Sequence, residues 1–319
     1  MVDNRMNVNQ LQKGDKVQEY YYIKDCVCKL TNGNNAKFLD INLMDRTGII
    51  NAKLWNYREE QDDYIKSNII VFVTGNVIEW KDKLQLKIDY LRKITEEDKV
   101  EVDDFVPVAP YSSMDMYEEI LKYKENIKNQ DIKNIVEYIL NEAGPKVMYY
   151  PAAKSNHHSV RSGLLYHTLT MLKAGRALSE IYDFVNSDLL YAGIILHDMA
   201  KVQEMNSSEL GIVEEYSVEG QLLGHIIIGV RNIETAARAV NASKEVSMLL
   251  QHMILTHHYE PEYGSPKKPM FPEAELLHHL DLIDARMYDM NKALSSTEPG
   301  MFSDKIWSLD NLSVYRNKL

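Results

Sequence analysis

Apolar and polar residues alternate along much of the first 95 residues of the chain. In "AKFLDINLMD", Leu39, Ile41 and Leu43 alternate with polar neighbours, a spacing typical of a strand with one buried face. The pattern predicts five strands, over residues 16–31, 36–45, 49–56, 69–80 and 84–94. It also predicts a short helix through "YREEQDDYIKS", between the third and fourth strands.

Five strands with a helix between the third and fourth are the order of an OB-fold, a small Greek-key barrel that often binds single-stranded nucleic acid. Residues 96–110, "EEDKVEVDDFVPVAP", are acidic and hold two prolines, which is typical of a linker. The rest of the chain reads as helices with little alternation. We therefore predict a multidomain protein, with an all-β OB-fold barrel over 1–95, an acidic linker over 96–110 and an all-α domain over 111–319.

Length and composition agree with a globular protein of two domains. The chain has 319 residues, of which 45% are hydrophobic and 26% charged. No apolar run approaches the roughly 20 residues that cross a bilayer, and the first residues lack the apolar core of a signal peptide, so we expect a cytoplasmic protein without a membrane partner. Cys26 and Cys28 share one face of a strand and are expected to be reduced core residues.

Charge is distributed unevenly between the two portions of the chain. Residues 1–95 carry 15 Lys and Arg against 13 Asp and Glu, whereas the remainder carries 21 against 34 and has a net charge of −13. Metal ions bound in the acidic portion would offset part of this charge locally.

The first domain offers aromatic side chains interleaved with cations. Bases stack on exposed aromatic rings, while cationic side chains contact the phosphates. The alternative is that most of these rings fill the core of the barrel. A net charge of only +2 predicts weak, salt-sensitive binding. The candidate contacts are Phe38, Trp55, Phe72 and Trp80, with Lys37, Arg46, Lys53, Lys81 and Lys83.

All ten histidines lie in the helical portion, several of them inside apolar helices. A buried imidazole or carboxylate needs a polar partner, and a metal ion is the best partner for several at once. Mixed nitrogen and carboxylate ligands suit Mn²⁺, Fe²⁺, Co²⁺, Ni²⁺ or Zn²⁺ better than Ca²⁺. The residues concerned are His167, the pair His197 and Asp198, then His225, the pair His257 and His258, and Asp281.

The order of these residues resembles the signature of the HD-domain metal-dependent phosphohydrolases, and the interposed His225 and "THH" resemble the subset that holds two metals. The longer strings "YPAAKSNHHSVRSGLLYHTL", "LHDMAK", "GHIIIG" and "HHYEPEYGSPKKPMFPEAELLHHLDLIDAR" are similar to the YhaM-type 3′→5′ exoribonucleases, which join an OB-fold to an HD domain. This resemblance covers nearly the whole chain.

The resemblance implies two divalent ions per chain, most readily Mn²⁺, with Co²⁺, Fe²⁺ or Ni²⁺ as alternatives. One ion would be held by His167, His197, Asp198 and Asp281. The other would be held by Asp198, His225 and His257, with His258 able to replace or support His257. Asp198 would bridge the ions, and Lys201, at i+4 from His197, would project to the same mouth and act on the phosphate.

The expected activity is hydrolysis of single-stranded RNA, with single-stranded DNA as a second substrate, from the 3′ end to nucleoside monophosphates. The alternatives are a nucleotide or cyclic-dinucleotide phosphohydrolase, or a single-strand-binding, replication-associated protein with an inactive HD part. A homo-oligomer is allowed by the sequence. The candidate substrate contacts are Lys154, Ser155, His157, His158, Arg161, His258, Lys267 and Lys268.

Overall fold

The computed structural model of the protein describes residues 6–31, 35–58, 65–98, 100, 102–154 and 158–319. The chain divides into two compact units, Met1–Pro107 and Val108–Leu319, which we call the barrel unit and the helical unit. The division falls within the segment 96–110 that was expected to be a linker. This segment contains two 3₁₀ turns, η3 (Glu96–Asp98) and η4 (Val102–Asp104).

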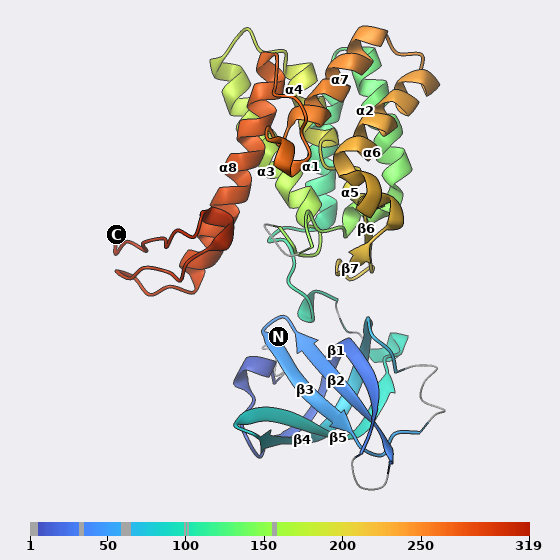
Figure 1. The fold of residues 1–319 in the computed structure, drawn as a ribbon, viewed down its shortest axis with the longest axis vertical. Helices are drawn as coiled ribbons and strands as arrows, with labels where there is room; N and C mark the ends of the chain where they lie inside the picture. The colour runs from blue at the N-terminus through green and yellow to red at the C-terminus, as the bar shows by residue number, and fades with distance from the viewer. Residues whose placement is uncertain (1–5, 32–34, 59–64, 99, 101, 155–157) are drawn as a thin grey trace. The chain divides into compact units, whose positions relative to one another are not determined.

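The barrel unit is a closed barrel of five strands (Figure 1). The strands are β1 (Lys16–Leu30), β2 (Lys37–Asp45), β3 (Gly48–Leu54), β4 (Ile69–Trp80) and β5 (Lys83–Lys93). β1 pairs antiparallel with both β2 and β4, and β3 pairs with β5 in parallel, which closes the barrel. This strand order confirms the predicted OB-fold.

Alternation along the strands places the apolar side chains in the barrel core. Leu39, Ile41 and Leu43 of β2 are at most 3% exposed, as their spacing predicted. Gly75 marks a register shift between β4 and β5, where an added Cβ would lie 2.3 Å from the carbonyl oxygen of Lys87. Only glycine allows the two backbones to approach so closely at this point.

The expectation that both cysteines are buried was wrong. Cys26 is half-buried and Cys28 is exposed. Both pair in register with core residues of β2, but the last four residues of β1 lie at its exposed end, beyond the part of the strand that the core covers. The helix predicted through residues 57–67 falls largely on 59–64, outside the described residues.

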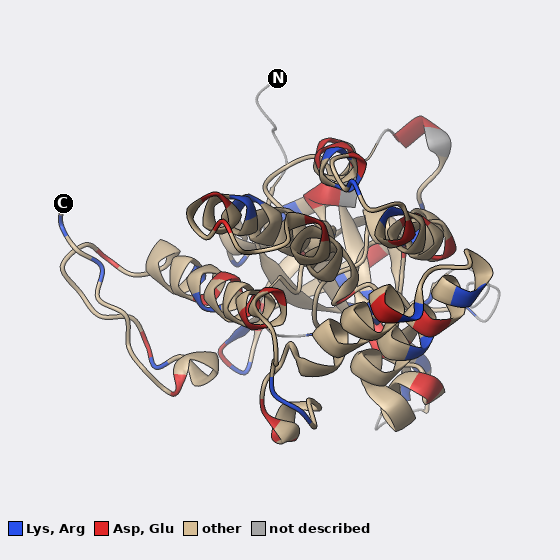
Figure 2. Cartoon of the chain, turned by 90° about the horizontal axis from the view of Figure 1, so that it is seen from above, with Lys and Arg blue, Asp and Glu red and all other residues tan. Residues whose placement is uncertain are grey.

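The helical unit is built from eight helices and one short hairpin among the residues that the structure describes. The helices are α1 (Ser113–Glu125), α2 (Gln130–Ala143), α3 (Gly163–Ile181), α4 (Ser187–Leu196), α5 (Lys201–Glu204), α6 (Val218–Ala239), α7 (Lys244–Thr256) and α8 (Pro272–Ser295). The hairpin of β6 (Met205–Ser207) and β7 (Val213–Tyr216) was not anticipated from the sequence. Lys and Arg are interspersed with Asp and Glu along the helices (Figure 2).

Polar side chains fix where five of these helices begin. Each cap accepts a hydrogen bond from a backbone N–H group of the first turn, which otherwise has no partner within the helix. The caps are Ser112 for α1, Asn129 for α2, Asn186 for α4, Ser217 for α6 and Ser243 for α7.

Helix α4 lies at the centre of the helical unit and is apolar on every side, as expected for a buried helix. It packs against α2, α3, α7 and α8, and its residues from Ala192 to Leu196 are all buried. Its C-terminal end leads directly into His197 and Asp198. Within the described part of the chain, no helix has an apolar stretch long enough to cross a membrane.

Candidate metal centre

The end of α4 places two adjacent polar side chains in the interior of the helical unit. His197 is 0% exposed and Asp198 is 2% exposed. The α-helix ends at Leu196, and the chain turns before α5 begins at Lys201, so both side chains contact the same cluster of ligands. His197 Nδ1 donates to the carbonyl oxygen of Ile194 at 2.8 Å, which leaves Nε2 as an acceptor.

Four side-chain atoms, from helices α3 and α8 and from the α4–α5 turn, lie near one another at the first candidate site. His167 Nε2 lies 3.1 Å from His197 Nε2 and 3.3 Å from Asp281 Oδ1. Asp198 Oδ2 lies 3.4 Å from His197 Nε2 and 3.7 Å from His167 Nε2. Ligands held about 2.0–2.2 Å from one ion are spaced roughly 3.0–3.6 Å apart. Three of the four separations fall in this range and the fourth, at 3.7 Å, is just beyond it, so the group is suited to a metal ion.

The protonation of His167 gives a second reason to place a cation at this site. His167 Nδ1 donates to Asp284 Oδ2 at 2.7 Å, so the Nε2 atom of a neutral His167 carries a lone pair. This lone pair would face that of His197 Nε2 at 3.1 Å, and the two would repel each other unless a proton or a metal ion lay between them. Burial alone would lower the pKa of His167, but Asp281 and Asp284 raise it to about 10 in the metal-free protein. The negative charges of Asp281 and Asp284 therefore favour a cation beside His167.

A second group of acceptor atoms lies on the other side of Asp198. Asp198 Oδ1 is 3.5 Å from His225 Nε2 and 4.0 Å from His257 Nε2. All three atoms are buried, and none of them has a hydrogen-bond partner among the described residues. Burial without a partner is costly for polar atoms, and a divalent cation would satisfy all three at once.

Hydrogen bonds to Nδ1 fix the orientation of each imidazole in this second group. His257 donates to the carbonyl oxygen of Ile254 at 2.7 Å, and His258 donates to that of Tyr263 at 2.7 Å. His225 Nδ1 lies 3.1 Å from Glu204 Oε1. Since Nδ1 carries the proton in each ring, each Nε2 has a free lone pair, the arrangement common to metal-binding histidines. His258 groups with His225 and His257 within 4.8 Å, so it is available to the same ion.

Asp198 directs its two oxygens to different groups, and a buried lysine contacts one of them. Lys201 Nζ lies 2.6 Å from Asp198 Oδ2, and the residue is only 9% exposed. Burial alone would raise the pKa of Asp198, but the positive charge of Lys201 holds it well below its usual range. Lys201 thus pairs with Asp198, whereas the sequence had related it to His197.

The predicted substrate contacts on the helical unit include exposed cations. Lys154 is exposed, with its ammonium 5.8 Å from the ring of Tyr216, and Arg161 donates to the carbonyl oxygen of Glu209 at 2.9 Å. Lys267 and Lys268 are both exposed. Ser155 and His157 lie outside the described residues.

His158 lies inside the unit, at 1% exposure, and reaches the metal centre through a carboxylate. Its Nε2 is 2.7 Å from Asp284 Oδ2, the same atom that accepts from His167. Asp284 was missed in the sequence, as was Glu204. The available signal for Asp284 was its spacing, one helical turn beyond Asp281, which places both carboxylates on one face of α8.

The barrel unit presents two exposed tryptophans on different parts of its surface. Trp55 is 45% exposed and stacks on Phe38 at 4.5 Å, whereas Phe38 itself is 8% exposed. Lys53 pairs with Asp40 at 2.6 Å, and its ammonium is 5.4 Å from the Phe38 ring. Lys37, at the start of β2, is exposed.

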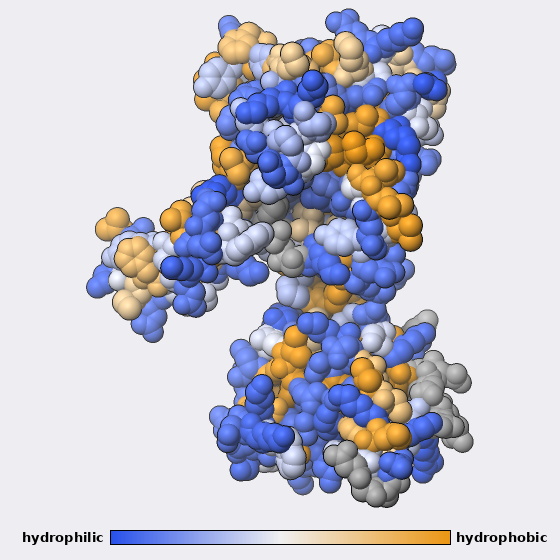
Figure 3. All heavy atoms as spheres, viewed as in Figure 1, coloured by the Kyte–Doolittle hydropathy of each residue, from blue (hydrophilic) through white to orange (hydrophobic). Residues whose placement is uncertain are grey.

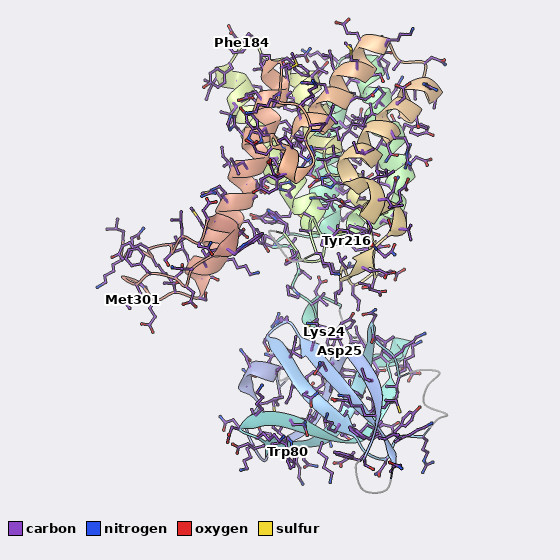
Figure 4. The ribbon with its side chains drawn as sticks, in the orientation of Figure 1. Lys24, Asp25, Trp80, Phe184, Tyr216 and Met301 are labelled. Carbon is purple, nitrogen blue, oxygen red and sulfur yellow. The ribbon has the colours of Figure 1, made fainter. Side chains whose placement is uncertain are left out.

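Trp80, at 62% exposure, lies at the margin of the barrel unit, where β4 turns into β5 (Figure 4). It lines a groove of about 630 Å³ together with Ile49, Leu84, Lys81 and Lys83. Apolar and hydrophilic side chains are interleaved on this unit (Figure 3). An aromatic ring beside lysines is the chemistry that binds a stacked base and its phosphate.

Comparison with known proteins agrees with both units. The HD domain model matches residues 164–286, and the OB-fold nucleic acid binding domain model matches residues 24–94. A protein of Geobacillus sp. (strain WCH70) named "3′-5′ exoribonuclease YhaM" is 42% identical over 303 residues, which cover 95% of this chain and 92% of the relative. Proteins of the same name from Halalkalibacterium halodurans and Bacillus subtilis are 41% and 38% identical and are covered to 94% and 95%. The chain therefore belongs to the YhaM family of 3′-5′ exoribonucleases.

Proposed function

We propose that this protein is a metal-dependent exoribonuclease that shortens single-stranded RNA from its 3′ end and releases nucleoside monophosphates. One observation supports the hydrolytic centre above all others. The Nε2 atoms of His225 and His257 converge on Asp198 Oδ1 in the interior of the unit, and none of these three atoms has a hydrogen-bond partner among the described residues. Single-stranded DNA is the second substrate to compare, because base stacking and phosphate contacts do not require a 2′-hydroxyl.

The donor set supports two ions bridged by Asp198. The first ion would be held by His167, His197, Asp198 Oδ2 and Asp281. The second would be held by Asp198 Oδ1, His225 and His257, with His258 beside them. Imidazole and carboxylate ligands together favour Mn²⁺, Fe²⁺, Co²⁺ or Ni²⁺, and we propose Mn²⁺ as the first to test.

Ions bound in such a site lower the pKa of water and stabilise the attacking and leaving oxygens of an in-line displacement at phosphorus. The side chains of this chain supply the remaining requirements. Asp198 and the histidines fix the geometry, since their orientations are set by neighbouring carbonyls and carboxylates. Lys201 places a positive charge beside Asp198, where it can neutralise a phosphate oxygen of the substrate.

The barrel unit is proposed to hold the RNA strand upstream of the cleaved nucleotide. Trp55 and Trp80 offer exposed faces on which bases can stack, and Lys81 and Lys83 can contact the backbone. These features disfavour a nucleotide or cyclic-dinucleotide phosphohydrolase, because a small diffusing substrate needs no such surface. The complete ligand set disfavours an inactive binding protein.

The proposal is tested with 5′-labelled single-stranded RNA and Mn²⁺, with and without EDTA. We expect a ladder of products that retain the label, together with free nucleoside monophosphates, and no products in EDTA. The Asp198→Ala variant should be inactive. The His279→Ala variant is the matched control, because the His279 side chain is 53% exposed and pairs with Glu275 one helical turn away on the surface of α8. Immediate release of a short labelled fragment, or undiminished activity in EDTA, would refute the proposal.

A further inference from the structure

Helix α6 changes course one residue before His225. Gly224 has φ 69° and ψ 160°, a conformation that interrupts an α-helix and that glycine adopts without strain. The helix therefore consists of two segments, 218–223 and 225–239, and His225 is the first residue of the second segment. The backbone N–H groups at the start of a helical segment need acceptors from outside it.

Glu204, the last residue of α5, supplies that acceptor. Its Oε1 accepts from the backbone N–H of His225 at 2.9 Å. The same oxygen lies 3.1 Å from Nδ1 of the His225 ring. One carboxylate oxygen thus holds both the main chain and the side chain of His225, which directs Nε2 towards Asp198.

Glu204 is itself fixed by close contacts between α5 and α6. Its carbonyl oxygen accepts from the N–H of Ser217 at 2.9 Å, and Ser217 Oγ donates to the carbonyl oxygen of Gln203 at 2.7 Å. Gly220 packs so tightly that an added Cβ would lie 2.1 Å from the Glu204 carbonyl oxygen. The position of Glu204 is therefore set by the backbone.

We propose that Glu204 is a positioning residue that orients His225 toward the second metal ion and couples the kink in α6 to the segment that follows Asp198. This inference rests on the proposed role of His225 as a metal ligand. The charge of Glu204 also favours metal binding at a distance, but its main action is geometric, through two hydrogen bonds to one residue. Carboxylates that orient metal-binding histidines typically contribute roughly 10–100-fold to metal affinity.

Three variants of the full-length protein test the proposal. Glu204→Ala removes the acceptor and should lower the affinity for the second ion roughly 10–100-fold. The affinity for the first ion should stay near that of the parent protein. Glu204→Gln keeps a carbonyl oxygen at the same reach and should restore most of that affinity. Glu219→Ala is the matched control, on the same helix as His225, because the Glu219 side chain is 41% exposed and pairs with Arg231, and this variant should bind both ions like the parent.

The measurement is calorimetric titration of the metal-free protein with Mn²⁺, repeated with Co²⁺ so that its absorption spectrum reports the ligands. The titration uses no RNA, so its result for the role of Glu204 does not depend on the outcome of the exonuclease assay. A double variant with His225→Ala separates positioning from general stability. If Glu204 acts through His225, Glu204→Ala should cause no further loss of metal affinity once His225 is absent.

Four outcomes would overturn the proposal. They are a parent protein that binds a single ion, a Glu204→Ala variant with two parental affinities, a Glu204→Gln variant as weak as Glu204→Ala, or additive losses in the double variant. If Glu204→Ala fails to fold, as judged by circular dichroism, Glu204→Gln and Glu204→Asp decide instead. The shorter Asp side chain withdraws the shared oxygen, so Glu204→Asp should bind the second ion more weakly than Glu204→Gln, and equal affinities would count against the proposal.

Discussion

The Asp198→Ala substitution should destabilise the protein even when no metal is present. Asp198 pairs with Lys201 at 2.6 Å, and the side chains are 3% and 11% exposed. Removing one partner of a buried ion pair leaves an uncompensated charge, which typically costs about 3–5 kcal/mol. Asp281 and Glu204 also act on the charge of Lys201 and raise its pKa, although burial alone would lower it. We therefore expect a loss near the lower limit, about 3 kcal/mol.

The assay is thermal unfolding in EDTA, followed by far-ultraviolet circular dichroism, which reports mainly on the helical unit. A loss of this size should lower the unfolding temperature of the helical unit by roughly 6–12 °C. The double variant Asp198→Ala, Lys201→Met removes both charges and should recover most of that stability, because no buried ion remains unpaired. Its metal content should stay as low as that of the single variant.

The two variants separate the ion pair from metal binding. An Asp198→Ala protein that unfolds at the parental temperature in EDTA would show that Lys201 is not held as a buried partner. Equal instability of the single and double variants would place the loss elsewhere in the turn after α4. Full metal content in either variant would refute the bridging role of Asp198.

Three further results are expected. The Lys201→Met variant should have a lower kcat while its metal affinity falls little, because its proposed role is to stabilise phosphate charge; unchanged kcat would remove Lys201 from the reaction. Trp55→Ala and Trp80→Ala should each weaken binding of long single-stranded RNA by on the order of 1–3 kcal/mol while dinucleotide turnover stays the same, and equal losses on both substrates would count against the stacking role. The metal-free protein should be less stable at high pH, because the pKa of His167 is raised by Asp281 and Asp284, against the effect of burial, from 6.5 to about 10. This contribution is complete below pH 6.5 and is lost as pH rises through about 10, so an unfolding temperature that rises over that interval would contradict it.

The barrel was predictable because its strands alternate with a period of two. The alternation of Leu39, Ile41 and Leu43 with polar residues identifies the buried face of β2, and the same alternation predicted all five strands. The rule failed for Cys28, since periodicity gives the face of a residue but not how far the core extends along the strand. It also gave no warning of the β6–β7 hairpin, whose strands are too short to show alternation.

The histidines of the metal centre stood out in the sequence because imidazoles are rare inside apolar helices. The carboxylates that orient them did not stand out, since Asp284 and Glu204 lie in charged surroundings typical of helix surfaces. The partner of Lys201 depended on where α4 ends, and helix ends are set by tertiary packing as much as by local sequence. The residues that orient the candidate metal ligands could thus be identified only from the structure, whereas the candidate ligands themselves could be identified from the sequence.

Helix α8 holds one imidazole by both of its nitrogens, and this arrangement has a consequence for the order of assembly. Asp284 and His167 are 117 positions apart in the chain, so their contact closes a long loop and should form late in folding. During synthesis, a chain that has not yet reached Asp281 lacks both a proposed ligand of the first ion and the carboxylate of Asp284 that accepts a hydrogen bond from His167. The proposed hydrolytic centre should therefore be completed only after α8 has left the ribosome, so a nascent chain that ends before α8 should have no exonuclease activity.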